Sequence, residues 1–502
     1  MSTAAPVVTT GGRSARQRDL LDLLGVLGLV LVAAAVRVPT LAEQSFWLDE
    51  AYTERLVRMS FGGMLHAIPI SESTPPLYYV LAWGWTHLFG YSEFGIRSLS
   101  ALAGILIVPV VYATALRLAD RKAALIAGAL VALSPLLIWY SQEARAYGLA
   151  TLLSSVSLMC LVGFLDTGGR GWLVCFAVSS ALGLATHYFV GFVVAPELAW
   201  LLWRRRRDRR VVVAAAVVTA VAAALVPLAL AQRGTGHADY ISVGSLTTRV
   251  LQIPKQFLTG YASPSQLISS VVAALLAGSG ALVVLIRARS RPDQRALIPM
   301  AVGVACVLFP IGLALVGVDF VDTRNLLPAL PPLLIAVSIG FAALTSTRLA
   351  ITLASSLAAV FILVVALVDT NPRYQRDNWR GASEALGRYR QPRAIVVAGG
   401  SQGIPVEVYQ ANLRPLGRAA VTELDVLAIP PRLSGGGLGT PPRPQGAVAV
   451  PAGFRLTRAD YASTFTVLRY TASKPVSVTA AGLDGVLLGS PSSYALLQQA
   501  PP

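Results

Sequence analysis

The chain has 502 residues, of which 55% are hydrophobic and only 13% are charged, and its mean hydropathy is +0.63. This composition excludes a soluble globular protein of that size and indicates a polytopic membrane protein. The formal net charge of +16 does not indicate a nucleic-acid partner, because the arginines concentrate in short turns between apolar runs and in the C-terminal tail.

The first apolar run covers residues 20–38 and follows Arg13, Arg16 and Arg18. It continues without an A-x-A cleavage site, so we expect a retained signal-anchor helix whose N-terminus lies inside the cell. Residues 1–19 would then form a cytoplasmic N-terminal tail.

Apolar stretches of roughly 17 to 25 residues are long enough to cross a bilayer as helices. About eleven such spans are predicted: 20–38, 96–116, 123–141, 148–165, 172–189, 190–203, 211–231, 265–286, 297–317, 325–345 and 349–368. With a cytoplasmic N-terminus, most Lys and Arg of the connecting loops lie on the inner side, as the positive-inside rule requires. We therefore expect a transmembrane domain over 20–368 in the plasma (inner) membrane.

One apolar stretch, Pro75 to Gly90, is not counted as a span because it is short, rich in aromatic residues and carries His87. Aromatic rings favour the headgroup level of a membrane, and counting this stretch would move the Arg204 to Arg210 run to the outer side. We expect the first outer loop, 40–95, to form a platform parallel to the membrane.

The tail, 369–502, is more polar and richer in proline, and the predicted topology places it outside the cell. Its short apolar runs, such as 394–398 and 465–468, are typical of strands. About 130 residues suffice for one small domain, and we predict a compact α/β module interrupted by a flexible loop at 434–446.

Two adjacent carboxylates, Asp49 and Glu50, follow Trp47 and Leu48 at the outer end of the first span. Charged groups are costly near lipid, so their presence there indicates a site. On a helix that begins here, neighbouring side chains point about a quarter turn apart, so one carboxylate can face a cavity while the other organises it. The alternative is that Asp49 caps the helix and Glu50 interacts with its dipole.

A second polar cluster contains Glu143, Arg145 and Tyr147 and follows the third span on the outer side. In an extended loop these alternate residues would share one face and present an acid, a cation and a phenol together. An arginine fork suits a phosphate because it offers several fixed donors and keeps its charge. The alternative is an arginine at the membrane interface that pairs with Glu143.

Three further positions are candidates. His187 ends the fifth span, where it would bind phosphate, acceptor or a metal, or would simply be an interfacial polar residue; metal is the least favoured because no clustered His or Cys spacing exists. Arg324 opens the tenth span, where it would bind phosphate because a helix N-terminus favours anions. The alternative is that Asp322 merely neutralises the charge of Arg324. Glu197 is an acid inside the membrane and a site candidate for that reason.

Five segments in a fixed order carry a resemblance to a known family: 46–51, 73–79, 94–98, 141–147 and 324–328. They resemble the GT-C membrane glycosyltransferases, particularly the branch related to protein O-mannosyltransferases and the aminoarabinose transferase of lipid A (glycosyltransferase family 39-like). The similarity covers roughly residues 20–370. It implies a GT-C fold and an enzyme that moves a sugar from a polyprenyl-phosphate donor to an acceptor on the outer face of the membrane.

The resemblance also implies roles. Asp49 would be the general base that deprotonates an acceptor hydroxyl for inverting attack, and Arg145 and Arg324 would hold the lipid phosphate. Glu50 would be the second catalytic residue, and it would position the acceptor or the sugar together with Glu143 and His187. Tyr147 would also bind substrate. The donor would carry a mannose-type or pentose sugar, and the acceptor would be a polysaccharide, a glycolipid or a protein.

Two departures from the family pattern bear on the chemistry. Thr74 stands where family members often carry a histidine, and Tyr147 stands where many carry an aspartate. The second departure argues against a two-carboxylate metal site, so we expect a reaction that needs no metal and no other cofactor. The rival interpretations are a flippase or secondary transporter of lipid-linked sugars, and a noncatalytic subunit of envelope assembly.

Overall fold

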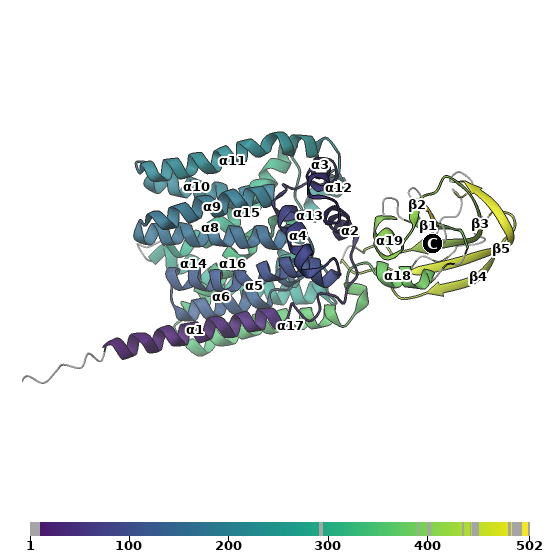
Figure 1. Cartoon of the computed structure of the whole chain (residues 1–502). Helices are drawn as coiled ribbons and strands as arrows, with labels where there is room; N and C mark the ends of the chain where they lie inside the picture. The colour runs from purple at the N-terminus through teal and green to yellow at the C-terminus, as the bar shows by residue number, and fades with distance from the viewer. Residues whose placement is uncertain are drawn as a thin grey trace, which may run out of the picture.

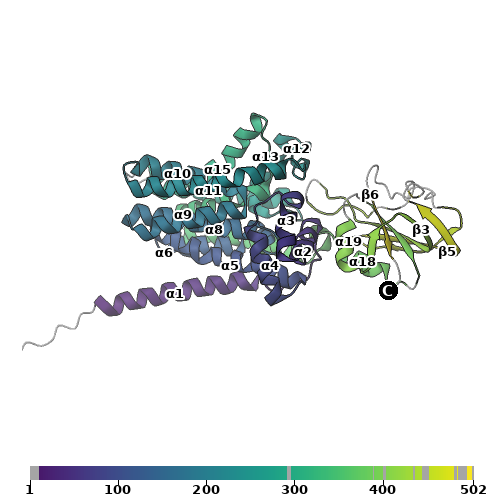
Figure 2. The same ribbon diagram turned by 45° about the horizontal axis from the view of Figure 1, so that its top comes forward.

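The computed structural model describes residues 11–290, 295–387, 389, 391–398, 403–433, 436–441, 443, 451–479, 483 and 494–499 (Figure 1). Most of the predicted N-terminal tail and part of the predicted flexible loop at 434–446 lie outside these residues. The described chain forms a bundle of long helices, a layer of short helices at one end of it, and a C-terminal unit with a sheet beyond that layer (Figures 1 and 2).

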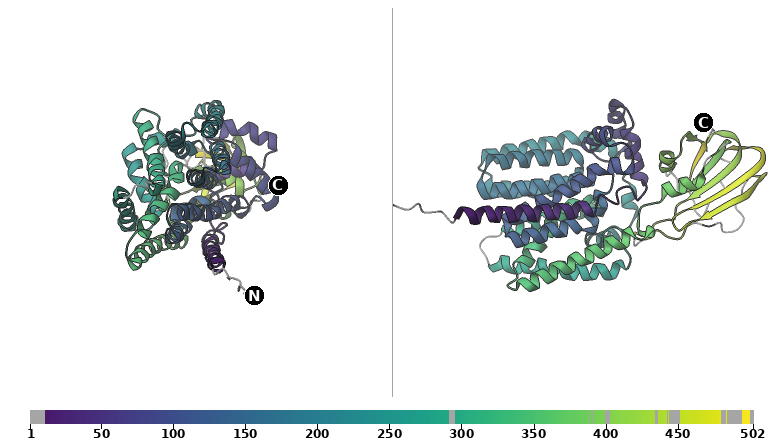
Figure 3. Two further views of the ribbon diagram at one scale, coloured as in Figure 1. Left: turned by 90° about the vertical axis from the view of Figure 1, so that its left-hand side faces the viewer. Right: turned by 60° about the horizontal axis from the view of Figure 1, so that its bottom comes forward.

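The bundle consists of the long apolar helices and the short helical turns between them. Its elements are α1 (Gly11–Ala35), α5 (Glu93–Leu118), α6 (Arg121–Leu133), α7 (Pro135–Ser141), α8 (Tyr147–Thr167), α9 (Arg170–Thr186), η1 (Tyr188–Val190), α10 (Gly191–Arg205), α11 (Arg209–Arg233), α14 (Gln266–Ser290), η2 (Arg295–Leu297), α15 (Ile298–Leu315), η3 (Thr323–Ala329), α16 (Leu330–Ala342) and α17 (Thr347–Asp369). Viewed along the bundle, α1 stands at its periphery (Figure 3).

Each of the eleven predicted spans coincides with helical structure, but the count of eleven is not confirmed. Within the described residues, seven helices are long and apolar enough to cross a membrane, or eight if the pair α6 and α7 forms one span with a 56° bend. The bend falls where Pro135 follows Ser134, since a proline at a helix start lacks the N–H that would continue the preceding helix. The helices α9 and α10 have only 17 and 15 residues, which makes them shorter than the seven counted helices. In α1, charged residues occur as far along the helix as Asp22, so its uninterrupted apolar part is short.

Small residues allow the bundle helices to approach closely. A Cβ atom added to Gly340 on α16 would collide with the carbonyl oxygen of Gly280 on α14. Close approach at small residues is typical of helices packed inside membranes, where van der Waals contact replaces the hydrophobic effect as the main attraction.

Short helices form a layer at the end of the bundle that faces the C-terminal unit (Figures 1 and 2). They are α2 (Leu48–Val57), α3 (Phe61–Ser71), α4 (Leu77–Phe89), α12 (Tyr240–Val243) and α13 (Leu246–Thr259). The 13 residues of α4 fall within the Pro75 to Gly90 stretch. They extend for about 20 Å, which is too short to cross a hydrocarbon core of about 30 Å, so this stretch does not provide a span.

The C-terminal unit is a six-stranded mixed sheet with helices on one face. Its elements are η4 (Pro372–Tyr374), α18 (Trp379–Leu386), β1 (Arg393–Ala398), α19 (Gly403–Tyr409), β2 (Leu413–Pro415), β3 (Arg418–Ala428), β4 (Phe454–Tyr461), β5 (Thr466–Thr479) and β6 (Tyr494–Gln499). The strand order is β2-β6-β1-β3-β5-β4, and β1 and β3 are parallel while the other neighbours are antiparallel.

The two helices of this unit lie between the sheet and the bundle. Trp379 of α18 and Val406 of α19 are fully buried against Ile395, Val397 and Leu427 of the sheet. The predicted small α/β module is therefore present, and its location outside the cell stays a prediction.

Candidate functional site

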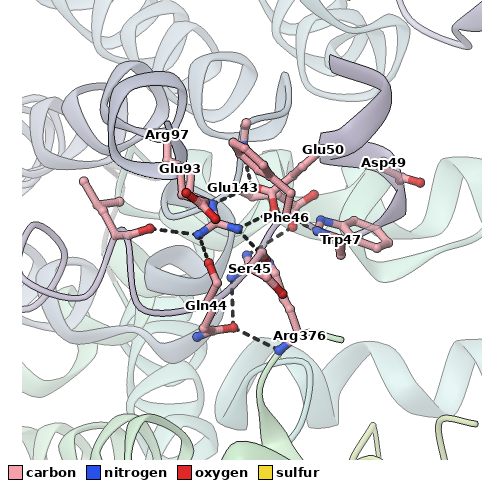
Figure 4. A network of polar contacts seen from close by, with 12 residues as sticks. Gln44, Ser45, Phe46, Trp47, Asp49, Glu50, Glu93, Arg97, Glu143 and Arg376 are labelled. Atoms are coloured by element: carbon pink, nitrogen blue, oxygen red, sulfur yellow. Dashed lines mark hydrogen bonds and ion pairs between the residues drawn. The ribbon is translucent and has the colours of Figure 1, made fainter. Parts of the chain in front are cut away.

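The first turn of α2 points its two carboxylates in different directions. Trp47, with extended backbone, precedes the helix, and its N–H donates a 3.4 Å hydrogen bond to Oε2 of Glu50. Asp49 is the second residue of the helix, so the alternative prediction that it caps α2 is wrong. Figure 4 shows Asp49 turned away from the group that surrounds Glu50.

Glu50 is fully buried and is bound by Arg97 of α5 through two contacts. Nε of Arg97 lies 2.7 Å from Oε1 of Glu50, and Nη2 lies 2.6 Å from Oε2. The backbone N–H of Ala144 donates a third hydrogen bond, of 2.8 Å, to Oε1. Burial alone would raise the pKa of Glu50, but the charge and hydrogen bonds of Arg97 outweigh it, so the pKa is lowered. Glu50 is thus an ionised anchor for the α2 turn and does not line the cavity.

Asp49 faces a cavity of about 500 Å³ at the end of the bundle that carries the layer of short helices. Nη1 of Arg324 lies 3.0 Å from its Oδ2, and Nε of the same arginine lies 3.3 Å from Oδ2 of Asp322. Asp49 and Arg324, which the sequence offered as separate candidates, therefore meet in the structure although they lie far apart in the chain.

Arg145 lies beside Asp49 in the same cavity. Its Nη1 is 2.9 Å from Oε2 of Glu72, 3.2 Å from the hydroxyl of Thr53 and 3.3 Å from the carbonyl oxygen of Asp49. Because these contacts all involve one nitrogen, the rest of the guanidinium keeps donors for a bound anion.

Glu72 is a cavity residue that the sequence reasoning missed. It is buried, it accepts a hydrogen bond from the Tyr79 hydroxyl on the oxygen that contacts Arg145, and burial raises its pKa. Its other oxygen, Oε1, is buried without a hydrogen-bond partner among the described residues. The signal was available, because Glu72 is the one acid between the apolar runs of α3 and α4 and directly precedes the 73–79 segment.

His187 and Tyr147 complete the polar side of the cavity. Their ring centroids are 5.3 Å apart, and the Arg324 guanidinium carbon lies 6.0 Å from the Tyr147 centroid. Burial, with the positive charges of Arg145 and Arg324, lowers the pKa of His187 to about 3, so this side chain is neutral and can donate or accept a hydrogen bond.

Glu143 does not join this cluster, and the predicted common face for Glu143, Arg145 and Tyr147 is wrong. The segment between α7 and α8 is a tight turn in which the Arg145 N–H donates to the Glu143 carbonyl oxygen, so the Glu143 side chain diverges from those of Arg145 and Tyr147, which both line the cavity. Glu143 is buried behind the cavity, where its Oε2 lies 3.4 Å from Nη2 of Arg376. Burial raises its pKa to about 7 despite Arg376. The alternative prediction, that Arg145 pairs with Glu143, is also wrong, because its partner is Glu72.

The opposite side of the cavity is apolar and is built largely by α11. Val226 and Leu230 line it, although 49% and 62% of these residues are exposed. The apolar wall therefore continues onto the surface that α11 presents outside the bundle. Arg233 and His237 stand at the end of this wall. A polar chamber joined to an apolar wall suits a ligand with a charged head and a hydrocarbon tail.

One other sequence candidate has different surroundings. Glu197 is buried in α10, where the Ser157 hydroxyl donates a 2.8 Å hydrogen bond to its Oε2, and it does not line the cavity. Within the described residues, no group of three or more His, Cys, Asp or Glu side chains could hold a metal ion.

Comparisons with known proteins show what the chain is similar to in sequence and in fold. Residues 73–230 match the sequence model of the dolichyl-phosphate-mannose-protein mannosyltransferase family. No curated protein sequence matches the chain.

Two solved structures of ArnT from Cupriavidus metallidurans are similar in fold. The apo structure gives a TM-score of 0.52 at 13% identity, over 91% of this chain and 98% of ArnT. The structure bound to undecaprenyl phosphate gives 0.51 at 13% identity, over 88% and 97%.

The archaeal oligosaccharyltransferase AglB from Archaeoglobus fulgidus, in complex with an inhibitory peptide and a dolichol-phosphate, gives a TM-score of 0.50 at 12% identity, over 78% of this chain and 64% of AglB. Identities this low show the fold alone. The predicted resemblance to the GT-C membrane glycosyltransferases is thereby confirmed, in fold along most of the chain and in sequence over residues 73–230.

Proposed function

We propose that this protein is a glycosyltransferase that moves a sugar from a polyprenyl-phosphate donor to a cell-envelope acceptor on the outer face of the plasma (inner) membrane. The observation that carries the proposal is one cavity in which Asp49 lies beside Arg145 and Arg324 and opposite an apolar wall. The similarity to ArnT, which has been solved with undecaprenyl phosphate, supports the class of donor.

The cavity accommodates each part of such a donor. The prenyl chain lies along Val226 and Leu230, which connect the cavity with the membrane-facing surface of α11. The phosphate lies between Arg145 and Arg324, with Arg233 at the rim. Arginine suits this role because its planar donors match phosphate oxygens and its charge is permanent.

The reaction is an inverting displacement at the anomeric carbon. The acceptor hydroxyl oxygen forms a bond to that carbon as the bond from the carbon to the phosphate oxygen breaks, and Asp49 takes the hydroxyl proton. The leaving polyprenyl phosphate gains negative charge, which Arg145 and Arg324 stabilise in a site with little water. Binding of the phosphate to Arg324 competes with the 3.0 Å pair between Arg324 and Asp49, so donor binding leaves Asp49 free to act as the base.

The remaining cavity residues orient the sugar and the acceptor. Oε1 of Glu72, which has no hydrogen-bond partner in the described part of the chain, accepts a hydrogen bond from a sugar hydroxyl, since a buried acceptor of this kind favours a ligand that supplies a donor. Neutral His187 and Tyr147 offer further hydrogen bonds. The sugar is of the mannose or pentose type, the acceptor is a polysaccharide, a glycolipid or a protein, and no metal takes part.

An assay in detergent separates this proposal from transport. Purified protein is incubated with a panel of synthetic polyprenyl-phosphate sugars and candidate acceptors, and the glycosylated product is measured by mass spectrometry. A transferase turns over without sealed vesicles, and the donor that reacts identifies the sugar. Movement of lipid-linked sugar across proteoliposomes with no product in detergent would instead indicate the flippase.

A further inference from the structure

The three residues that precede the α2 turn are each hydrogen-bonded by a residue from beyond the last bundle helix. The segment is Gln44, Ser45 and Phe46, here called the support segment, and it leads through Trp47 into the turn that carries Asp49. Figure 4 shows this segment between Arg97 on one side and Arg376 on the other.

The contacts on the C-terminal side follow the support segment residue by residue. The backbone N–H of Arg376 donates a 2.9 Å hydrogen bond to Oε1 of Gln44. The Ser45 hydroxyl donates to the Asp377 carbonyl oxygen at 2.6 Å and accepts from the Trp379 N–H at 3.0 Å.

Tyr409, the last residue of α19, binds Phe46 and α5 together. Its hydroxyl accepts a 2.7 Å hydrogen bond from the Phe46 N–H and donates one of 2.7 Å to Oε1 of Glu93. Val408 and Tyr409 pack in the same apolar cluster as Phe46 and Leu56 of α2. The phenol therefore fixes the backbone of the support segment at a point three residues before Asp49.

The opposite side of the support segment is held by the bundle. Nη1 of Arg97 donates to the Gln44 carbonyl oxygen at 2.6 Å, and Nη2 donates to that of Ser45 at 2.9 Å. The same guanidinium binds Glu50. The turn that carries Asp49 is thus held by hydrogen bonds from Arg97 on one side and from the C-terminal unit on the other. Loss of the hydrogen bonds on either side allows the turn to move. A shift of about 1 Å in a reacting group is enough to cost on the order of a hundredfold in rate.

From these contacts we infer that the C-terminal unit positions the catalytic turn, with Tyr409 as a positioning residue that sets the distance of Asp49 from the reacting atoms. This inference rests on the proposed function. It assigns the C-terminal unit a part in the chemical step although none of the residues described in that unit lines the cavity.

The test compares full-length Tyr409→Phe with wild type and with Tyr461→Phe, which removes an exposed phenol from β4 of the same unit. Tyr409→Phe leaves the buried Phe46 N–H without an acceptor, and we expect kcat to fall about tenfold while the KM for the polyprenyl-phosphate sugar stays within about twofold. A merely structural defect would lower the fraction of active protein, and it would also lower the temperature of thermal unfolding.

A second variant and a second readout keep the test independent of folding and of activity. Ser45→Ala removes the bridge to Asp377 and Trp379 and should reproduce the effect on kcat. Hydrogen exchange of the 44–50 peptide should become about threefold faster or more in both variants and should stay unchanged in Tyr461→Phe.

The outcomes are distinct. Sugar transfer by wild type with unchanged kcat in both variants would overturn the inference and leave the proposed function standing. An absence of transfer by wild type would overturn the proposed function. Faster exchange of the 44–50 peptide in the variants would then still support the inference that the C-terminal unit positions this turn. A lower kcat together with faster exchange would support both.

Discussion

Nη1 of Arg324 lies 3.0 Å from Oδ2 of Asp49, although 275 residues separate the two in the chain. Each group has a role of its own in the proposed reaction, Asp49 as the base and Arg324 as a ligand of the donor phosphate. The pair neutralises both charges in a cavity that is largely apolar. When the donor binds, its phosphate replaces the Asp49 carboxylate as the partner of Arg324. Donor binding therefore frees Asp49 to act as the base.

Arg324→Gln should remove a phosphate ligand and the partner of Asp49 together. We expect kcat/KM to fall by about a hundredfold or more, as removal of a single stabilising donor commonly does. Steady-state kinetics with the donor found in the panel assay measures the change. Arg121→Gln is the matched control, because Arg121, the first residue of α6, pairs with Asp22 of α1 and does not line the cavity. Equal losses in the two variants would contradict a role for Arg324 in donor binding.

Glu72→Gln should weaken recognition of one sugar hydroxyl. The unpartnered Oε1 of Glu72 accepts that hydroxyl in the proposed complex, and the amide offers a weaker, uncharged acceptor or a donor in its place. We expect kcat/KM for the natural donor to fall about tenfold, which matches loss of a hydrogen bond to a charged group. A series of deoxy-sugar donors then identifies the hydroxyl, since the donor that lacks it should react equally well with both proteins. A uniform loss for every deoxy donor would contradict the assignment.

The burial of Glu143 makes the stability of the protein depend on pH. Its pKa is raised from 4.5 to about 7, so the folded protein binds a proton here more readily than the unfolded chain does. The contribution of Glu143 to the free energy of unfolding therefore falls as the pH rises from about 4.5 to about 7, and it is constant above that range.

Glu143→Gln removes this titration. Between about pH 5 and pH 7.5, we expect the Tm of wild type to fall by about 2 °C or more beyond any fall seen in Glu143→Gln. Thermal unfolding followed by tryptophan fluorescence measures the difference, and Glu384→Gln on the exposed side of α18 serves as control. Parallel curves for wild type and Glu143→Gln would show that Glu143 does not titrate in this range.

The reaction should not require a divalent metal. Arg145 and Arg324 face the proposed phosphate position, and Tyr147 lines the cavity at the place where many members of the resembled family carry an aspartate. We expect the initial rate of sugar transfer to change by less than about twofold after treatment with EDTA, because the guanidinium donors supply the stabilisation of the leaving group. Activity lost with EDTA and restored by a divalent ion would contradict this expectation.

The helices of the bundle could be predicted from the sequence because their signal is local. An apolar run of membrane length specifies a helix regardless of its neighbours, and all the predicted runs coincide with helices. The break between α6 and α7 was missed, although Pro135 marks it, because the run is apolar on both sides of the proline. The C-terminal module was predicted in outline only, because its sheet order depends on pairings between distant strands.

The site could be predicted in part. Asp49, Arg145 and Arg324 were found because a charge beside an apolar run is conspicuous in a membrane protein. The orientations of Glu50 and Glu143 could not be predicted, since each is decided by a distant arginine, Arg97 for the first and Arg376 for the second. Local spacing contains no information on such pairs.

The most direct test of the central claim compares single-turnover sugar transfer by wild type, Asp49→Asn and Asp120→Asn, each saturated with donor. Asp120 caps α6 at the opposite end of the bundle, and asparagine caps a helix as well as aspartate does, so this variant controls for loss of an acid. With Asp49 as general base, the Asp49→Asn rate should fall by roughly a hundredfold or more while the Asp120→Asn rate stays near that of wild type. Equal rates for Asp49→Asn and wild type would contradict the account, because the cavity would then perform its chemistry without the carboxylate that defines it.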